Sequence, residues 1–168
     1  MTASPRGATV QQGGRAKAYR PLRVADRRAA FTAGLAAYDR GDFFEAHEML
    51  EPAWMGTDDP AERDLHQGLI KLAAAFVHDV RGNPLGVARN LVGARARLAA
   101  ARDAIRAGAG PAIGVEVDLE ALVDAVDARL SALEADPTAT VEPPRIGRTG
   151  TTTGPAGQLD QTARARHP

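Results

Sequence analysis

Apolar residues recur at spacings of three and four along most of the chain, which is the period of a helix with one buried face. Most of these stretches follow an Asp or Asn suited to cap a helix, and most end near Gly or Pro. The pattern predicts an all-α fold, a compact bundle of about five helices built from antiparallel helical hairpins. The expected helices cover residues 26–39, 42–54, 61–81, 83–106 and 119–135.

The third stretch carries the broadest apolar surface, so we expect its helix at the centre of the bundle. Its main stripe consists of Leu65, Leu69, Leu72, Phe76 and Val80. The remaining narrow stripe is polar and holds Gln67, Lys71 and His78. If the second and third helices form the core hairpin, this polar stripe could meet polar groups of the second helix.

The second stretch has the densest cluster of ionisable groups. On a helical projection His47 lies on the same face as Trp54, and Glu51 lies beside them. Glu45 points the opposite way, where it completes a capping pattern with Asp42, and Glu48 lies at an edge. Pro52 is expected to kink or end this helix, because proline lacks the backbone donor.

The ends of the chain lack helical periodicity. Residues 1–20 are rich in Gly, Gln, Arg and Ala and are predicted to be a disordered basic arm. Residues 137–168 are dominated by Thr, Gly, Pro and Arg and are predicted to be a disordered tail. The helical domain is therefore expected to occupy residues 21–136 of the 168.

Composition excludes several classes of protein. The chain has no cysteine, so it has no disulfide, thiol nucleophile or zinc–thiolate site. No apolar run reaches the roughly 18 residues that span a bilayer, and the N-terminus lacks the apolar core of a signal peptide. We therefore expect a soluble cytoplasmic protein without a membrane partner.

The 21 basic and 21 acidic residues balance, and they occur in alternating blocks of opposite sign. Blocks of this kind are typical of helices that pack side by side, whereas a nucleic-acid-binding domain is more often net basic. Nucleic acid is thus an unlikely partner, and a homo-oligomer or a protein partner stays open. We expect an arginine stripe (Arg95, Arg102 and Arg106) to face the acidic flank of the last helix.

Three interpretations of the polar cluster remain open. The first is a satisfied buried network that fixes the register of the helices. The second is an internal pocket for a small polar ligand or acid–base chemistry. Its candidate catalytic residues are His47, Glu51 and His78, and its candidate ligand-binding residues are Glu48, Trp54, Gln67 and Lys71.

The third interpretation is a metal site formed by His47, Glu51 and His78. It is less favoured, because Glu51 occupies the place of the second His of the zinc-protease helix motif. His66 is expected at an exposed or edge position. The sequence does not decide whether the protein is an enzyme, and a non-enzymatic interaction module with a structural His/Glu cluster is the alternative.

Two motifs carry a resemblance to a known family. The first is Phe44-Glu45-Ala46-His47-Glu48-x-Leu50-Glu51-x-x-Trp54, and the second is Glu62-Arg63-Asp64-Leu65-x-Gln67-Gly68-Leu69-Ile70, followed by Ala73-Ala74, His78 and Arg81-Gly82-Asn83. In this order they resemble domain-of-unknown-function family 309, over roughly residues 35–98. The resemblance implies a small all-helical domain whose biochemical role is not established.

Departures from the family pattern bear on the metal interpretation. Met55 follows the Trp where members usually have a basic residue, and His66 replaces an apolar or aromatic one. Lys71 stands where many members have an uncharged residue, and a cation near Gln67 and His78 would repel a metal. We therefore expect a metal cofactor to be less favoured in this protein.

Overall fold

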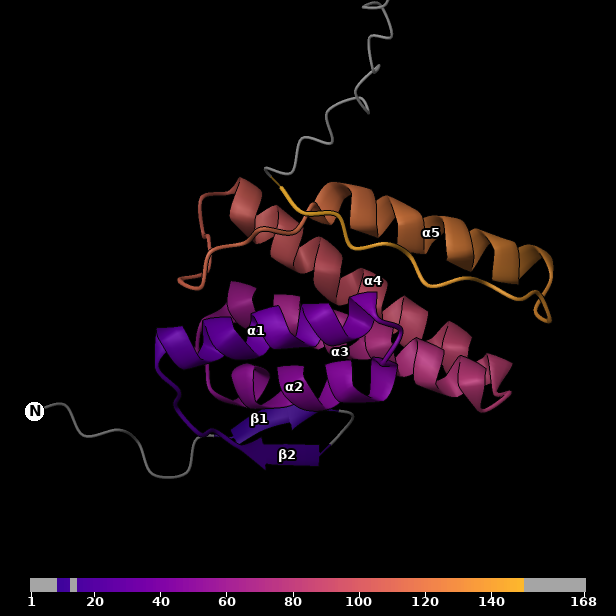
Figure 1. Ribbon diagram of the computed structural model, residues 1–168. Coiled ribbons are helices and arrows are strands. Elements are labelled where there is room, and N and C mark those ends of the chain that lie inside the picture. The colour runs from indigo at the N-terminus through magenta and orange to yellow at the C-terminus, as the bar shows by residue number, and fades with distance from the viewer. Residues whose placement is uncertain (1–8, 13–14, 150–168) are drawn as a thin grey trace, which may run out of the picture.

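The computed structural model describes residues 9–12 and 15–149, and in this part of the chain five helices form a compact bundle (Figure 1). This confirms the predicted fold class. The helices are α1 (Val24–Asp39), α2 (Phe43–Met55), α3 (Pro60–Val80), α4 (Pro84–Arg106) and α5 (Leu119–Ala135).

A short hairpin precedes the helices. Strands β1 (Thr9–Gln12) and β2 (Arg15–Ala18) pair antiparallel, with Thr9 opposite Ala18 and Gln12 opposite Arg15. The sequence predicts no regular structure there, since a four-residue strand of small and polar residues leaves no periodic signal. The rest of the predicted arm, residues 1–8 and 13–14, lies outside the described residues.

The predicted caps define four of the helix starts. Side-chain oxygens of Asp42, Asp59, Asn83 and Asp118 each accept a hydrogen bond from the backbone N–H three residues later. The exception is α1, which begins at Val24, and Asp26 instead pairs with Arg23 at 2.8 Å in the first turn.

Pro52 does not end α2, which continues to Met55. The ring removes a single donor, and the helix passes through it to place Trp54 inside the bundle with 1 % of its surface exposed. Of the two effects expected of Pro52, a kink or the end of the helix, the second is therefore wrong.

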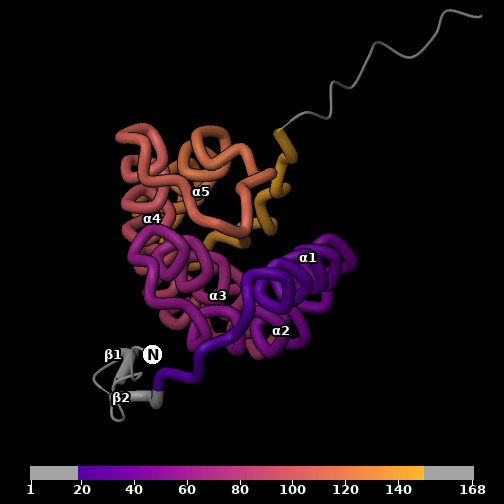
Figure 2. The backbone as a smooth tube through the Cα atoms, turned by 90° about the vertical axis from the view of Figure 1, so that its left-hand side faces the viewer, coloured from indigo at the N-terminus to yellow at the C-terminus, as the bar shows by residue number. Residues whose placement is uncertain are grey.

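Helix α3 is the centre of the bundle, as its broad apolar surface predicts. It packs most extensively against α4 and also contacts α2, while α1 packs on α2 and α5 on α4 (Figure 2). The close approach of α3 and α4 depends on Gly68, because a Cβ there would lie 2.7 Å from Cγ of Leu98. The predicted core hairpin of the second and third helices is thus present, but the α3–α4 contact is larger.

The segment after α5 is packed on the bundle, and residues 137–149 are called the strap from here on (Figure 1). Val141, Pro144 and Ile146 are buried, and the Tyr38 hydroxyl donates to the Pro144 carbonyl at 3.0 Å. At its end, Asp118 N–H donates to the Gly147 carbonyl at 2.9 Å.

Residues 137–149, which the sequence assigns to the disordered tail, thus lie against the bundle. Isolated apolar residues between prolines carry no helical or strand period, so their burial could not be seen in the sequence. Residues 150–168 of that predicted tail lie outside the described residues.

The arginine stripe of α4 faces the acidic flank of α5 as predicted. Arg95 pairs with Asp127 at 3.0 Å, and Arg102 and Arg106 both pair with Glu120. None of the described helices is both long and apolar enough to cross a membrane.

Candidate functional site

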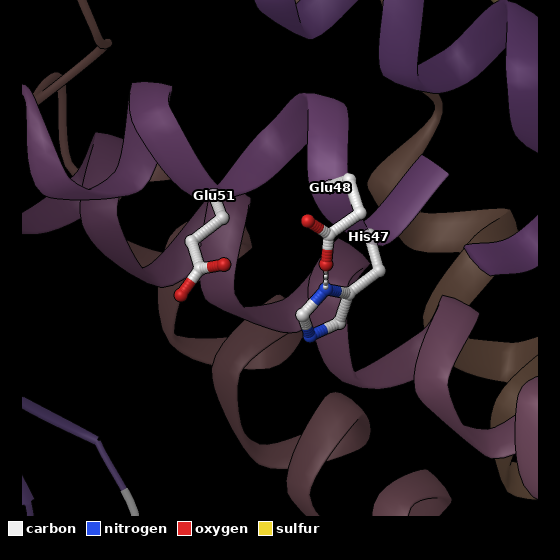
Figure 3. Close-up of side chains that lie close together, drawn as sticks. All are labelled: His47, Glu48 and Glu51. Carbon is white, nitrogen blue, oxygen red and sulfur yellow. Dashed lines mark hydrogen bonds and ion pairs between the residues drawn. The ribbon is translucent and has the colours of Figure 1, made fainter. Parts of the chain in front are cut away.

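The three ionisable side chains His47, Glu48 and Glu51 form a cluster on α2, called the α2 cluster below (Figure 3). His47 Nδ1 lies 3.2 Å from Glu48 Oε1, and Figure 3 shows the Glu51 carboxylate beside the imidazole ring. One potential ligand atom from each residue lies within 4.8 Å of the other two.

The α2 cluster lies at the edge of the bundle. The side chains of His47 and Glu48 are 28 % and 52 % exposed, and Glu51 is half-buried. The residues that α2 buries are Ala46, Leu50, Ala53 and Trp54. Because these occupy the inward face, the His47 imidazole and the Glu48 carboxylate remain accessible to a solute.

Other predicted site residues, Lys71 and His78, contact α4 instead of the α2 cluster. Lys71 extends along α4, where a Cβ on Gly93 would lie 2.8 Å from its Cδ. The His78 ring packs against Gly86 of α4, and its Nδ1 lies 3.1 Å from the Asn83 side-chain nitrogen.

Gln67 and Trp54 are both buried, at 5 % and 1 % exposure. Of the predicted site residues, the structure brings His47, Glu48 and Glu51 together, and all three belong to α2. Lys71 and His78 belong to the α3–α4 contact, because that flank of α3 is covered by α4.

A second polar cluster, which the sequence reasoning missed, joins α1 to α3. Glu62 is fully buried and accepts hydrogen bonds from Arg27 Nε at 2.5 Å and Arg27 Nη2 at 3.2 Å. His66 Nε2 lies 3.4 Å from Glu62 Oε1, and the His66 ring meets Phe31 edge-on with centroids 5.7 Å apart. These three polar residues, Arg27, Glu62 and His66, are called the buried triad below.

His66 is fully buried, so its predicted exposed or edge position is wrong. It lies on the side of α3 that the Phe31 side chain of α1 contacts. The available signal was the i, i+4 spacing of Glu62 and His66 on the flank of an apolar stripe, together with an arginine on the preceding helix.

The charges of the buried triad compensate one another. Burial raises the pKa of Glu62, but hydrogen bonds from His66 and Arg27 outweigh burial and hold that pKa below its ordinary value. The same contact with Glu62 raises the pKa of Arg27. The Arg27–Glu62 pair is typical of a structural network that fixes how helices pack. The sequence suggested such a network around His47 and Glu51 instead.

A hollow called the strap cleft below has a volume of about 620 Å³. One wall is the end of α1 and the turn into α2, from Tyr38 to Phe43, and the other is the strap from Glu142 to Ile146. It includes none of the residues of the α2 cluster or of the buried triad.

The protein is thus a small helical bundle with a half-exposed His/Glu cluster on its second helix. Residues 31–90 match the model of a family described as a domain of unknown function (DUF309). The match covers most of α1, all of α2 and α3, and the start of α4, and it confirms the resemblance carried by the two motifs. Neither the curated proteins nor the solved structures contain a match to the chain.

Proposed function

We propose that the domain binds a divalent transition-metal ion at the α2 cluster and presents its open coordination positions to a small polar ligand. The observation that carries this proposal is the meeting of His47, Glu48 and Glu51 within 4.8 Å at an accessible surface. One imidazole and two carboxylates form a donor set that suits zinc, iron or manganese.

The distances support a shared ion. Metal–ligand bonds of about 2.0–2.2 Å place neighbouring ligand atoms roughly 3–3.5 Å apart. The 3.2 Å between His47 Nδ1 and Glu48 Oε1 falls in that range. The longer separations in the cluster, up to 4.8 Å, require only a rotation of the Glu51 or Glu48 side chain.

The position of Lys71 removes one argument against metal. In the sequence its ammonium group would approach the site and repel a cation, whereas in the structure its side chain extends along Gly93 of α4. Glu48, placed at an edge by projection, adds a second carboxylate. The local charge of the cluster is thus more favourable to a cation than the sequence suggests.

Three ligands from one helix leave coordination positions for water or a small oxygen-containing ligand. A metal-bound water is more acidic than bulk water, so acid–base chemistry belongs to the same proposal. The class of the ligand is a small polar molecule with an oxygen or nitrogen donor.

Calorimetric titration of chelator-treated protein with Zn²⁺ and Mn²⁺ tests the proposal. We expect saturable binding of one ion, lost in His47→Ala and weakened about tenfold or more in Glu51→Gln. His78→Ala and Glu45→Gln are matched controls, because His78 bonds to Asn83 and Glu45 pairs with Arg40 at 3.0 Å. Binding that survives His47→Ala, or no binding by the parent protein, contradicts the proposal.

A second candidate function is association with a further protein chain. Phe44 and Val80 are 60 % and 81 % exposed and line, with Val77, a hollow of about 280 Å³ between α2 and α3. Large exposed apolar side chains around a hollow are typical of protein contact sites. If the partner is a second copy of the chain, sedimentation shows a dimer that Phe44→Ser dissociates, and a monomeric parent contradicts self-association.

A further inference from the structure

The strap cleft combines an apolar floor with charged groups of both signs. Tyr38 and Phe43 lie edge-to-face with ring centroids 5.2 Å apart, and Pro144 and Ile146 are buried in the opposite wall. A volume of about 620 Å³ lies within the roughly 300–1,000 Å³ usual for small-molecule sites.

The strap is held by bonds that leave the side chains of Glu142 and Arg145 unused. The Tyr38 hydroxyl donates to the Pro144 carbonyl at 3.0 Å, and Arg129 Nε donates to the Glu142 carbonyl at 3.0 Å. Both acceptors are backbone atoms. The side chains of Glu142 and Arg145 are exposed, and among the described residues neither makes an ion pair.

The charged side chains come from both walls. Asp39 closes α1 and is paired through one oxygen with Arg148 at 2.7 Å, and Glu142 and Arg145 lie on the strap. The Glu142 carboxylate, the Asp39 carboxylate with its Arg148 partner, and the Arg145 guanidinium therefore surround a floor of aromatic and proline rings. A ligand that satisfies all three carries an ammonium group, a carboxylate and an apolar body.

We propose that the strap cleft binds an amino-acid-like zwitterion. The apolar side chain lies against Phe43 and Tyr38, the ammonium group faces the carboxylates of Asp39 and Glu142, and the carboxylate faces Arg145. Arginine suits the last role, since its planar guanidinium can bind a carboxylate through two hydrogen bonds.

This site is independent of the α2 cluster. Its strap wall, residues 142–146, lies outside the family match to residues 31–90, whereas Tyr38, Asp39, Gly41 and Phe43 lie inside it. The cleft therefore joins a wall inside the matched segment to a strap outside it, and the amino-acid pattern does not mark that strap as folded.

Titration calorimetry in the presence of a metal chelator tests the proposal separately from metal binding. The probes are phenylalanine, phenethylamine, which lacks the carboxylate, and 3-phenylpropanoate, which lacks the ammonium group. We expect saturable binding of phenylalanine, with each single-charge probe about threefold or more weaker.

Variants locate the site. Arg145→Gln and Glu142→Gln are each expected to weaken phenylalanine binding about threefold or more, because each removes one charge partner at the surface. Arg89→Gln on α4 and Glu134→Gln on α5 are matched exposed controls and leave binding unchanged. The proposal is overturned if phenylalanine does not bind at millimolar concentration, if both cleft variants bind like the parent, or if a single-charge probe binds as tightly.

Discussion

Arg27 of α1 and Glu62 of α3 form a two-pronged ion pair inside the bundle, with Nε 2.5 Å from Oε1 and Nη2 3.2 Å from Oε2. Glu62 is fully buried, and the Arg27 side chain is 11 % exposed. The pair connects two helices through residues that are 35 positions apart in the chain. Burying these two charges costs free energy, and their mutual attraction offsets that cost only while both are present.

Removal of one partner of this pair is therefore expected to destabilise the fold strongly. Arg27→Met leaves the Glu62 carboxylate buried with His66 as its remaining contact, and we expect the free energy of unfolding to fall by about 3–5 kcal/mol. Chemical denaturation measures this change. The double variant Arg27→Met/Glu62→Met should lose much less than the sum of the single variants, and additive losses would show that the pair is not coupled.

The buried triad also predicts a pH dependence. The folded-state pKa of Glu62 is held below its ordinary value of 4.5, so its stabilising contribution is complete above that value. The contribution is lost as the pH falls from 4.5 through the lowered folded-state pKa. We expect the unfolding free energy of the parent to drop more steeply below pH 4.5 than that of Glu62→Gln, by up to about 1.4 kcal/mol per pH unit.

The control for this pH dependence is Asp136→Asn. The pKa of Asp136 is lowered by hydrogen bonds from Thr138, but this carboxylate is exposed at the surface. Its substitution should leave the steep acid limb in place. Equal slopes for the parent and Glu62→Gln would mean that Glu62 does not carry the acid sensitivity.

The bond between Tyr38 and Pro144 predicts how firmly the strap is attached. Burial raises the pKa of the Tyr38 phenol, which therefore stays protonated and donates to the Pro144 carbonyl. Tyr38→Phe removes this donor and should lower the free energy of unfolding by about 1 kcal/mol. Limited proteolysis should cut within residues 137–149 faster in this variant.

Tyr19→Phe is the matched control for strap attachment. Tyr19 is half-buried, and its hydroxyl makes no hydrogen bond with the described residues. Unchanged proteolysis in Tyr38→Phe would indicate that the buried Val141 and Ile146 hold the strap without the hydrogen bond.

The close contact of α3 and α4 predicts that an added methyl group destabilises the fold at Gly68 but not at the open position Gly110. A Cβ on Gly68 would lie 2.7 Å from Leu98 Cγ and 3.1 Å from the Leu98 backbone nitrogen, so Gly68→Ala must separate the helices. We expect a loss of about 1–3 kcal/mol in the free energy of unfolding. Gly110→Ala, whose Cβ would meet nothing within 4 Å, should be neutral or slightly stabilising in the same measurement.

The amino-acid pattern determined the helical architecture because its signals are local. Apolar residues at helical spacing and the capping residues Asp42, Asp59, Asn83 and Asp118 place four helix starts where the structure has them. The same pattern placed His47 and Glu51 side by side, since residues four apart share a helix face.

Tertiary structure alone decided what surrounds each face. Helix α3 packs against α2 and α4, and side chains of α1 reach it. His66, expected near the surface, is therefore buried against Phe31 and Glu62, while Lys71 and His78 turn to α4. A helical projection gives the direction of a side chain around its own helix axis, but it does not say which neighbouring helix packs against that side chain. The strap followed the same rule, because Pro144 and Ile146 are buried in a segment that bonds to Tyr38, about 100 positions earlier.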